Sequence, residues 1–264
     1  MKTNRVDIHN HTPLCNHANG TPKEYIKEAI KNGIDIYGFS DHAPLVSDFD
    51  PKYRMNISQM KEYEKEILNL KEKYKDDIKI LLGYEVDYLA NDILDFSSNT
   101  NIDYLIGSVH FVDKWGFDNP EFIGKYQDKD IDMIWKEYFS AIDEMVESGL
   151  FDIVGHLDLI KVFKFYPKTS ILELIKPTIE KIAKSNMSVE INSAGYRKPV
   201  AEQYPSSDIL KMCFEAGIDI TFGSDAHEVN QVGLNYEKVV NIAKDIGYTS
   251  CVYYENREKI RVKL

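Results

Sequence analysis

The histidines are the residues whose type and spacing indicate chemistry in this sequence. Histidine occurs seven times in 264 residues, and nearly every copy directly follows a short run rich in apolar and β-branched residues. A glutamate and an aspartate stand in the same kind of position. The set comprises His9, His11, His42, Glu85, His110, His156, Asp225 and His227, with His17 further out in the first loop. Imidazole and carboxylate ligands together suit zinc, manganese or iron, so the pattern predicts a metal site.

Alternating strands and helices would have to position these residues. Strand-like runs lie at about 5–9, 34–39, 78–84, 102–109, 151–155, 187–191, 218–222 and 249–254. Helical patterns lie at about 22–32, 58–75, 130–148, 170–186, 206–216 and 235–246, with capping boxes expected at Thr21/Glu24 and Ser170/Glu173. Seven or eight such repeats fit a closed or distorted (β/α) barrel with helices outside. An open doubly wound sheet is the alternative.

All strand ends of a parallel barrel share one rim, so the histidines, Glu85 and Asp225 should converge there. Alternation along a strand puts His9 and His11 on the same side, where both can bind one ion. The set exceeds one tetrahedral site, which points to two or three divalent ions. Taken singly, the motifs have structural alternatives: His42 as a helix cap, His156 with Asp158 as a buried pair, and 225–227 as a turn. The segment 111–129 breaks the rhythm and is expected to be an irregular, mobile loop over the site.

Composition narrows the class of substrate and the compartment. The net charge of −11 disfavours nucleic acid, and any phosphate site must supply its own positive charge. Three isolated cysteines, at positions 15, 213 and 251, suit a reducing cytoplasm. We expect neither a signal peptide nor a membrane span, because residues 1–5 lack an apolar core and no run approaches about 20 apolar residues. With no linker or change in composition, 1–264 is interpreted as one domain.

Several motifs resemble those of the PHP (polymerase and histidinol phosphatase) family, in the expected order along the whole chain. They are Asp7-Ile8-His9-Asn10-His11, Asp41-His42, Gly83-Tyr84-Glu85-Val86-Asp87, Gly107-Ser108-Val109-His110, Gly155-His156-Leu157-Asp158 and Gly223-Ser224-Asp225-Ala226-His227. Further runs look like the histidinol-phosphatase branch: Thr12-Pro13-Leu14-Cys15-Asn16-His17-Ala18, Lys52-Tyr53-Arg54-Met55 and Asn192-Ser193-Ala194-Gly195-Tyr196-Arg197-Lys198.

The resemblance implies a distorted (β/α)7 barrel with a trinuclear centre. His9, His11, Glu85 and Asp225 would hold the first metal. Glu85 would bridge to a second metal, also held by His110 and His156. The third would be held by His17, His42 and His227. The implied activity is hydrolysis of L-histidinol phosphate to L-histidinol and phosphate, in histidine biosynthesis.

Basic residues are the candidates for phosphate binding in such a reaction. We expect Arg197 to neutralise charge on the phosphoryl oxygens, with Arg54, Lys161 and Lys198 as further candidates. Lys161 stands where similar proteins often have arginine. Asp225 is a candidate proton shuttle for the leaving oxygen. Asp87 and Asp158 are candidates for orienting ligands. Asp113, Trp115 and Glu121 are conceivable contacts for the imidazole of the substrate.

Other functions remain open at this point. A different PHP phosphoesterase could act on other small phosphomonoesters or on nucleotides, or could be a 3′–5′ exonuclease. Acidic charge and the lack of a basic, aromatic-lined stripe argue against nucleic acid. A metal-binding module without catalysis is a further alternative, although the complete ligand set argues against it. The sequence does not set the oligomeric state or the metal that is bound in the cell.

Overall fold

The sheet of this protein is a barrel of seven parallel strands. A computed structural model describes residues 4–47, 49–90 and 92–264. The strands are β1 (Val6–Asp7), β2 (Ile36–His42), β3 (Lys79–Asp87), β4 (Tyr104–Ser108), β7 (Ile153–Val154), β8 (Ser188–Asn192) and β9 (Ile220–Gly223). They are hydrogen-bonded in the order β1-β2-β3-β4-β7-β8-β9, each parallel to its neighbour. Sequential order and parallel pairing confirm the predicted barrel.

The two ends of this sheet are joined by backbone hydrogen bonds just beyond β1 and β9. The amide of Ile8 donates to the carbonyl of Phe222 at 3.0 Å, and that of Asp225 donates to the carbonyl of His9 at 2.7 Å. His11 continues the row by donating to Ala226 at 3.0 Å. The closure therefore runs through the motifs that carry the candidate metal ligands, which brings the first and last of these motifs together. An open doubly wound sheet is excluded.

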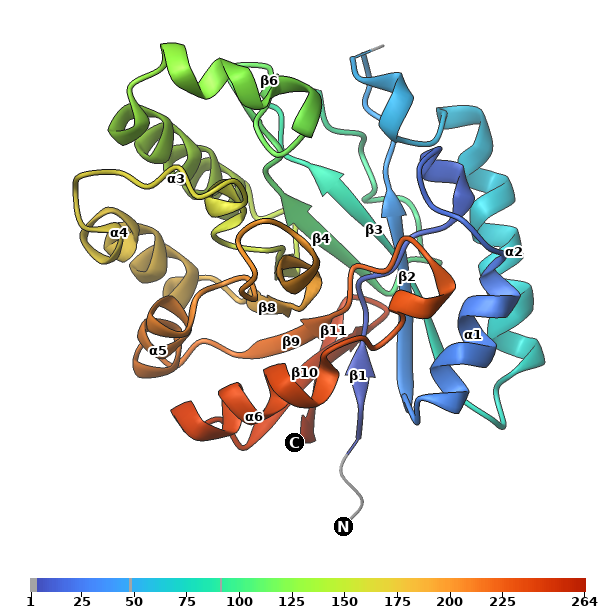
Figure 1. Ribbon diagram of the computed structural model, residues 1–264. Helices are drawn as coiled ribbons and strands as arrows, with labels where there is room; N and C mark the ends of the chain where they lie inside the picture. The colour runs from blue at the N-terminus through green and yellow to red at the C-terminus, as the bar shows by residue number, and fades with distance from the viewer. Residues whose placement is uncertain (1–3, 48, 91) are drawn as a thin grey trace.

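Helices surround the barrel (Figure 1). They are α1 (Pro22–Lys31), α2 (Met60–Lys73), α3 (Ile131–Glu147), α4 (Ile171–Lys184), α5 (Ser207–Glu215) and α6 (Tyr236–Ile246). Each matches a predicted helix to within a few residues. The connection 88–103 between β3 and β4 contains no helix among its described residues, which is one source of the distortion. No helix in the described part of the chain combines the length and apolar character needed to cross a membrane.

The helix ends confirm one predicted capping box and correct the other. Thr21 and Glu24 cap α1 reciprocally, as expected. Ser170 occupies the N-cap of α4, but its side chain makes no capping hydrogen bond. The entry to α4 is held by a tertiary contact instead, because the amide of Thr169 donates to Asp132 of α3 at 2.8 Å. A pattern of four residues cannot reveal such a competing partner.

The eighth predicted strand forms but does not join the barrel. β10 (Ser250–Glu255) pairs antiparallel with β11 (Glu258–Lys263), a strand that was not predicted. The segment 111–129 is also more regular than predicted, because it contains the hairpin β5 (Phe111–Val112) and β6 (Trp115–Gly116) and the 3₁₀ helix η4 (Pro120–Asp128). Its place beside the site is as predicted, since several of its side chains line the cavity described below.

One tyrosine inside the barrel, Tyr104, makes hydrogen bonds to the backbone next to the site. The Tyr104 hydroxyl donates to the carbonyl of Ile8 at 2.6 Å and is 3.2 Å from the carbonyl of Phe39. Glycine at positions 38 and 83 makes room for it, because a Cβ there would lie 2.2 Å and 2.5 Å from atoms of Tyr104. The Tyr104 hydroxyl therefore links β2 to the residue that directly precedes His9.

Candidate metal centre

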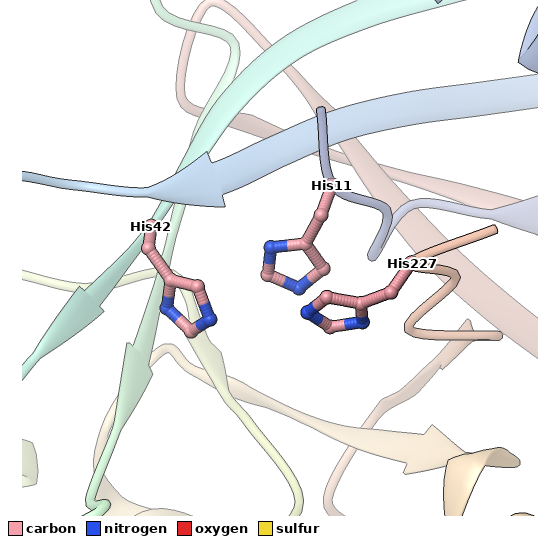
Figure 2. Close-up of side chains that lie close together, drawn as sticks. All are labelled: His11, His42 and His227. Atoms are coloured by element: carbon pink, nitrogen blue, oxygen red, sulfur yellow. The ribbon is translucent and has the colours of Figure 1, made fainter. Parts of the chain in front are cut away.

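The predicted metal ligands converge at the carboxyl ends of the barrel strands. His9 and His11 follow β1, His42 ends β2, Glu85 lies in β3, and His110 follows β4. The ring of His11 lies near the rings of His227 and His42 (Figure 2), with centroid distances of 4.0 Å and 4.5 Å, respectively. His17, from the loop after η1 (Pro13–Cys15), lies 4.6 Å from His227. Residues from both ends of the chain thus share one site.

Glu85 lies at the centre of this cluster, and its two oxygens face different histidines. Oε1 lies 2.9 Å from Nε2 of His156 and 3.6 Å from Nε2 of His110. Oε2 lies 3.2 Å from Nε2 of His9 and 3.1 Å from Nδ1 of His42. The carboxylate is buried with 1% of its surface exposed. One carboxylate therefore connects two groups of imidazoles, the position expected of a ligand shared by two ions.

The spacing of ligand atoms fits several ions. Three groups have ligand atoms within 4.8 Å of one another: His9 with His11 and Asp225, Glu85 with His110 and His156, and His11 with His42 and His227. Cys15, His17 and His227 form another such group, and His11, Cys15 and Asp41 a further one. Each of the first three groups overlaps one of the three sites that the family resemblance implies, but Glu85 is absent from the first group and His11 takes the place of His17 in the third.

Unpartnered nitrogens support the fit of metal ions to this donor set. Within the described ranges, several buried imidazole nitrogens have no well-oriented hydrogen-bond partner, although carboxylate oxygens lie 3.1 to 3.6 Å from some of them. They are Nε2 of His9, both nitrogens of His11, Nδ1 of His42, Nδ1 of His156 and Nε2 of His227. A buried polar atom without a partner costs free energy, and so many in one place would be costly without a ligand. Divalent cations would take up these lone pairs and offset the cluster's carboxylates.

A second layer of acceptors orients the imidazoles. Nδ1 of His110 donates to Asp87 at 2.6 Å, and Nδ1 of His9 donates to Glu190 at 2.7 Å. A carboxylate can only accept, so Nδ1 of each ring carries a proton, and Nε2 is the nitrogen left to bind a metal ion. The role predicted for Asp87 agrees with this contact. Asp158 pairs with Lys161 at 2.9 Å and accepts from the amide of Ser206, so the structure does not bring it to His156.

Glu190 is a residue that the sequence reasoning missed. It lies in β8, is 1% exposed, and its other oxygen accepts the backbone amide of His156 at 2.9 Å. The carboxylate thus fixes the candidate ligand His9, which follows β1, and the backbone of the candidate ligand His156, which follows β7. A Cβ at Gly223 would lie 2.0 Å from Glu190 Oε1, which explains the glycine at that position. The available signal was a charged residue inside the otherwise uncharged strand 188–192.

We expect Glu190→Gln to weaken metal binding about 10- to 100-fold, the range typical for the loss of an outer acceptor. The amide removes one of the two acceptor oxygens and leaves either His9 or the His156 amide without its partner. Equilibrium metal competition against a coloured chelator measures the effect. Glu180→Gln, on the exposed side of α4, is the matched control. Equal affinities in the two variants, with both proteins folded, would show that Glu190 does not position the site.

Without bound metal, the histidines fall into two groups, one with raised and one with lowered pKa values. Burial lowers the pKa of His11, but Asp225 and Asp41 outweigh this and raise it to about 9. His110 is likewise buried, and chiefly Asp87 raises its pKa to about 10. The pKa values of His17, His42 and His227 are lowered, chiefly by burial. The second group is therefore neutral and ready to ligate at neutral pH, whereas metal ions must displace protons from the first.

The pKa values of the two carboxylates of the cluster, Glu85 and Asp225, are lowered. Burial raises the pKa of Glu85, but the surrounding imidazoles, His9 first, hold it well below its usual value. Burial and the nearby histidines act on Asp225 in the same way. Both side chains are therefore ionised at neutral pH and able to bind cations. Asp225 also has a left-handed backbone, with φ of 51°, a conformation that is uncommon outside glycine and is often found at functional sites.

A cavity of about 610 Å³ opens on the cluster, and the predicted basic residues differ in their access to it. Arg197 and Lys198 line it. Nη2 of Arg197 donates to the carbonyls of Ser224 and Asp225 at 2.9 Å, while its buried Nη1 has no hydrogen-bond partner within the described part of the chain. The guanidinium is therefore held by one nitrogen and can offer the other to an anion.

The other two basic candidates are engaged elsewhere. Arg54 lines the cavity but is 4% exposed, and its guanidinium pairs with Asp87 at 2.8 Å and Asp50 at 3.1 Å. Its contacts support the Asp87–His110 pair rather than a phosphate. Lys161 is not among the residues that line the cavity, and its ammonium contacts Asp158, Glu202 and the carbonyl of Gln203 within 2.9 Å. The structure therefore gives no support to phosphate binding by Arg54 or Lys161.

Comparison with known proteins agrees with this geometry. The model of the PHP domain family matches residues 7–194. A Deinococcus radiodurans protein described as a probable histidinol-phosphatase is 36% identical over 93% of this chain and 95% of its own length. The histidinol-phosphatase of Bacillus subtilis is 31% identical over 88% of this chain and 96% of its own.

Solved structures agree on the fold. The histidinol phosphate phosphatase of Lactococcus lactis, solved with zinc, L-histidinol and phosphate, superimposes with a TM-score of 0.81 at 23% identity, over 98% of this chain and 100% of the other. The family model covers more than half of the chain, and two relatives above 30% identity extend over most of their length. The chain therefore belongs to the PHP family, in the branch that contains the histidinol-phosphatases.

Proposed function

We propose that this protein is a histidinol-phosphatase, which hydrolyses L-histidinol phosphate to L-histidinol and phosphate at a centre of two or three divalent metal ions. The observation that carries the proposal is Glu85, whose oxygens face two groups of imidazoles in a cavity that Arg197 also lines. Histidinol-phosphatases are also the relatives that this chain matches over most of its length.

The side chains fit distinct places in such a centre. The first ion would be held by His9, His11, Glu85 and Asp225, the second by Glu85, His110 and His156, and the third by His17, His42 and His227. When bound, divalent ions of this kind lower the pKa of water toward neutrality and neutralise phosphoryl charge. Zinc, manganese and iron all suit these nitrogen and oxygen donors.

Arg197 and one of the proposed ligands, Asp225, would complete the reaction. The free Nη1 of Arg197 would bind a phosphoryl oxygen, and the carbonyls of Ser224 and Asp225 keep the guanidinium in place. Asp225 lies 3.1 Å from Nε2 of His11 and is ionised, so it can accept the proton of the attacking water. It would then donate that proton to the leaving alkoxide, which releases L-histidinol. Lys198 is a second candidate for phosphate contact because it also lines the cavity.

We further propose that the enzyme acts only on small phosphomonoesters and that it lies in the cytoplasm. A cavity of about 610 Å³ suits a metabolite, and a net charge of −11 opposes binding to a nucleic acid backbone. Phosphate release should be compared for L-histidinol phosphate, O-phosphoserine, a nucleoside monophosphate and single-stranded DNA. We expect kcat/KM to be highest for L-histidinol phosphate. A preference for the nucleotide or cleavage of the DNA would overturn the substrate while leaving the metal centre intact.

A further inference from the structure

Most of the carboxylates that line the cavity already have partners. Glu85 and Asp225 face the histidines. Asp50 and Asp87 pair with Arg54 at 3.1 Å and 2.8 Å. One of the two remaining carboxylates, Glu121, pairs with Lys52 at 3.3 Å and is exposed. The other is Asp118.

Asp118 has no side-chain partner among the residues that the structure describes. Across residues 4–47, 49–90 and 92–264, no hydrogen bond or ion pair joins its carboxylate to another side chain. It also belongs to none of the groups whose ligand atoms lie within 4.8 Å of one another, so it is not placed as a metal ligand. Burial raises the pKa of Asp118, although His110 and Lys198 oppose the shift. Asp118 is half-buried in the wall of the cavity, and a cationic ligand there would give its carboxylate the ion pair that it lacks.

The backbone on both sides holds Asp118 in place. The amide of Phe117 donates to the carbonyl of His110 at 3.3 Å, and the Phe117 ring is fully buried against Tyr138. On the other side, the side chain of Asn119 caps η4 by accepting from the amide of Glu121 at 2.9 Å. Asp118 is thus fixed between a core anchor and a helix cap, so its position over the cavity is set before any ligand binds.

The other acidic and aromatic residues considered for this part of the site are less suitable. Asp113 is exposed in the β5–β6 turn and does not line the cavity. Trp115 is 3% exposed and packs on Tyr126, so it too lies outside the cavity lining. Glu121 lines the cavity but already has Lys52. Asp118 is therefore the carboxylate left free to take a cation.

We propose that Asp118 binds the protonated amine of the substrate and so makes the enzyme selective for phosphomonoesters that carry an ammonium group. The inference rests on the proposed function, because L-histidinol phosphate has its amine two carbons from the phosphate oxygen. With the phosphate at Arg197 and the metal centre, the ammonium would complete the missing ion pair of Asp118. The residue acts on binding and on specificity, and takes no part in proton transfer.

A matched pair of small substrates tests this directly in the wild-type enzyme. 2-Aminoethyl phosphate carries the ammonium, and n-propyl phosphate has a methyl group in its place. We expect kcat/KM to be about 10- to 100-fold higher for the amine, as for hydrogen bonds to charged groups. Equal values for the two would overturn the proposal without recourse to any variant. This result is distinguishable from failure of the proposed function, which would appear as loss of the preference for L-histidinol phosphate over the wider panel.

Asp118→Asn should remove the preference for the amine. We expect kcat/KM for 2-aminoethyl phosphate and L-histidinol phosphate to fall about 10- to 100-fold, mostly through KM, with n-propyl phosphate unchanged. Asp113→Asn, an exposed change of the same kind in the same segment, should leave all three values within about twofold. Metal content and thermal unfolding show whether the variants remain loaded and folded. A uniform loss on all substrates at full metal content, or a loss confined to L-histidinol phosphate, would overturn the ammonium contact.

Discussion

Glu85→Gln is expected to lower kcat/KM for L-histidinol phosphate by about 1,000-fold or more, because several kcal/mol of metal-dependent charge stabilisation would be lost. The substitution keeps the shape of the side chain but replaces one oxygen with a nitrogen that cannot bind a cation. The two oxygens face separate groups, with His156 at 2.9 Å from one and His42 at 3.1 Å from the other. Either orientation of the amide therefore leaves one group without its carboxylate.

Metal content distinguishes this explanation from simple loss of fold. We expect Glu85→Gln to bind fewer equivalents of metal than the wild type, as measured by elemental analysis, while its circular dichroism spectrum is retained. Glu62→Gln, on the exposed face of α2, is the matched control and should behave like the wild type. Near-normal turnover of Glu85→Gln at full metal content would rule out a shared ligand at this position.

Arg197→Ala is expected to lower kcat/KM by about 100- to 1,000-fold, the cost typical of removing a fixed donor to a developing anion. Metal content should not change, because the guanidinium contacts carbonyl oxygens and no histidine. Inorganic phosphate should also inhibit the variant more weakly as a product. Isothermal titration with phosphate, alongside steady-state kinetics, measures both effects.

Arg197→Lys is the informative companion to this variant. A lysine ammonium keeps the charge but cannot contact both carbonyls in the plane of a guanidinium while presenting a second nitrogen to the phosphoryl group. We therefore expect activity between that of the alanine variant and the wild type. Unchanged kinetics in both variants would place Arg197 outside the substrate site and leave Lys198 as the remaining basic residue at the cavity wall.

The barrel and the gathering of the candidate ligands at one rim could be predicted because both depend on local patterns. Strand runs are recognised from residue type, and His42 or His110 follows directly at the end of such a run. Parallel order then brings every strand end to one rim, so adjacency in space follows from topology alone. The β10–β11 hairpin was harder to place, because β10 has the residue types of a barrel strand and only its antiparallel partner reveals its position.

The contacts that orient the ligands could not be predicted because they join residues far apart in the chain. Glu190 lies 181 positions from His9, and no pattern around either residue indicates the other. The same limit applies to Lys161, whose positive charge and place after the Gly155–Asp158 motif suggested a contact with phosphate. Two of its partners, Glu202 and the carbonyl of Gln203, lie 41 and 42 residues further on and help to hold the ammonium. The free carboxylate of Asp118 likewise stands out only once the partners of its neighbours are known.

The most direct test is to remove all metal with a chelator and then measure phosphate release from L-histidinol phosphate as zinc, manganese or iron is returned in counted equivalents. We expect no activity in the metal-free protein and a recovery that requires at least two equivalents per chain, in keeping with a carboxylate shared between ions. Full activity without metal, or full recovery with a single equivalent, would contradict a centre of two or three ions built around Glu85.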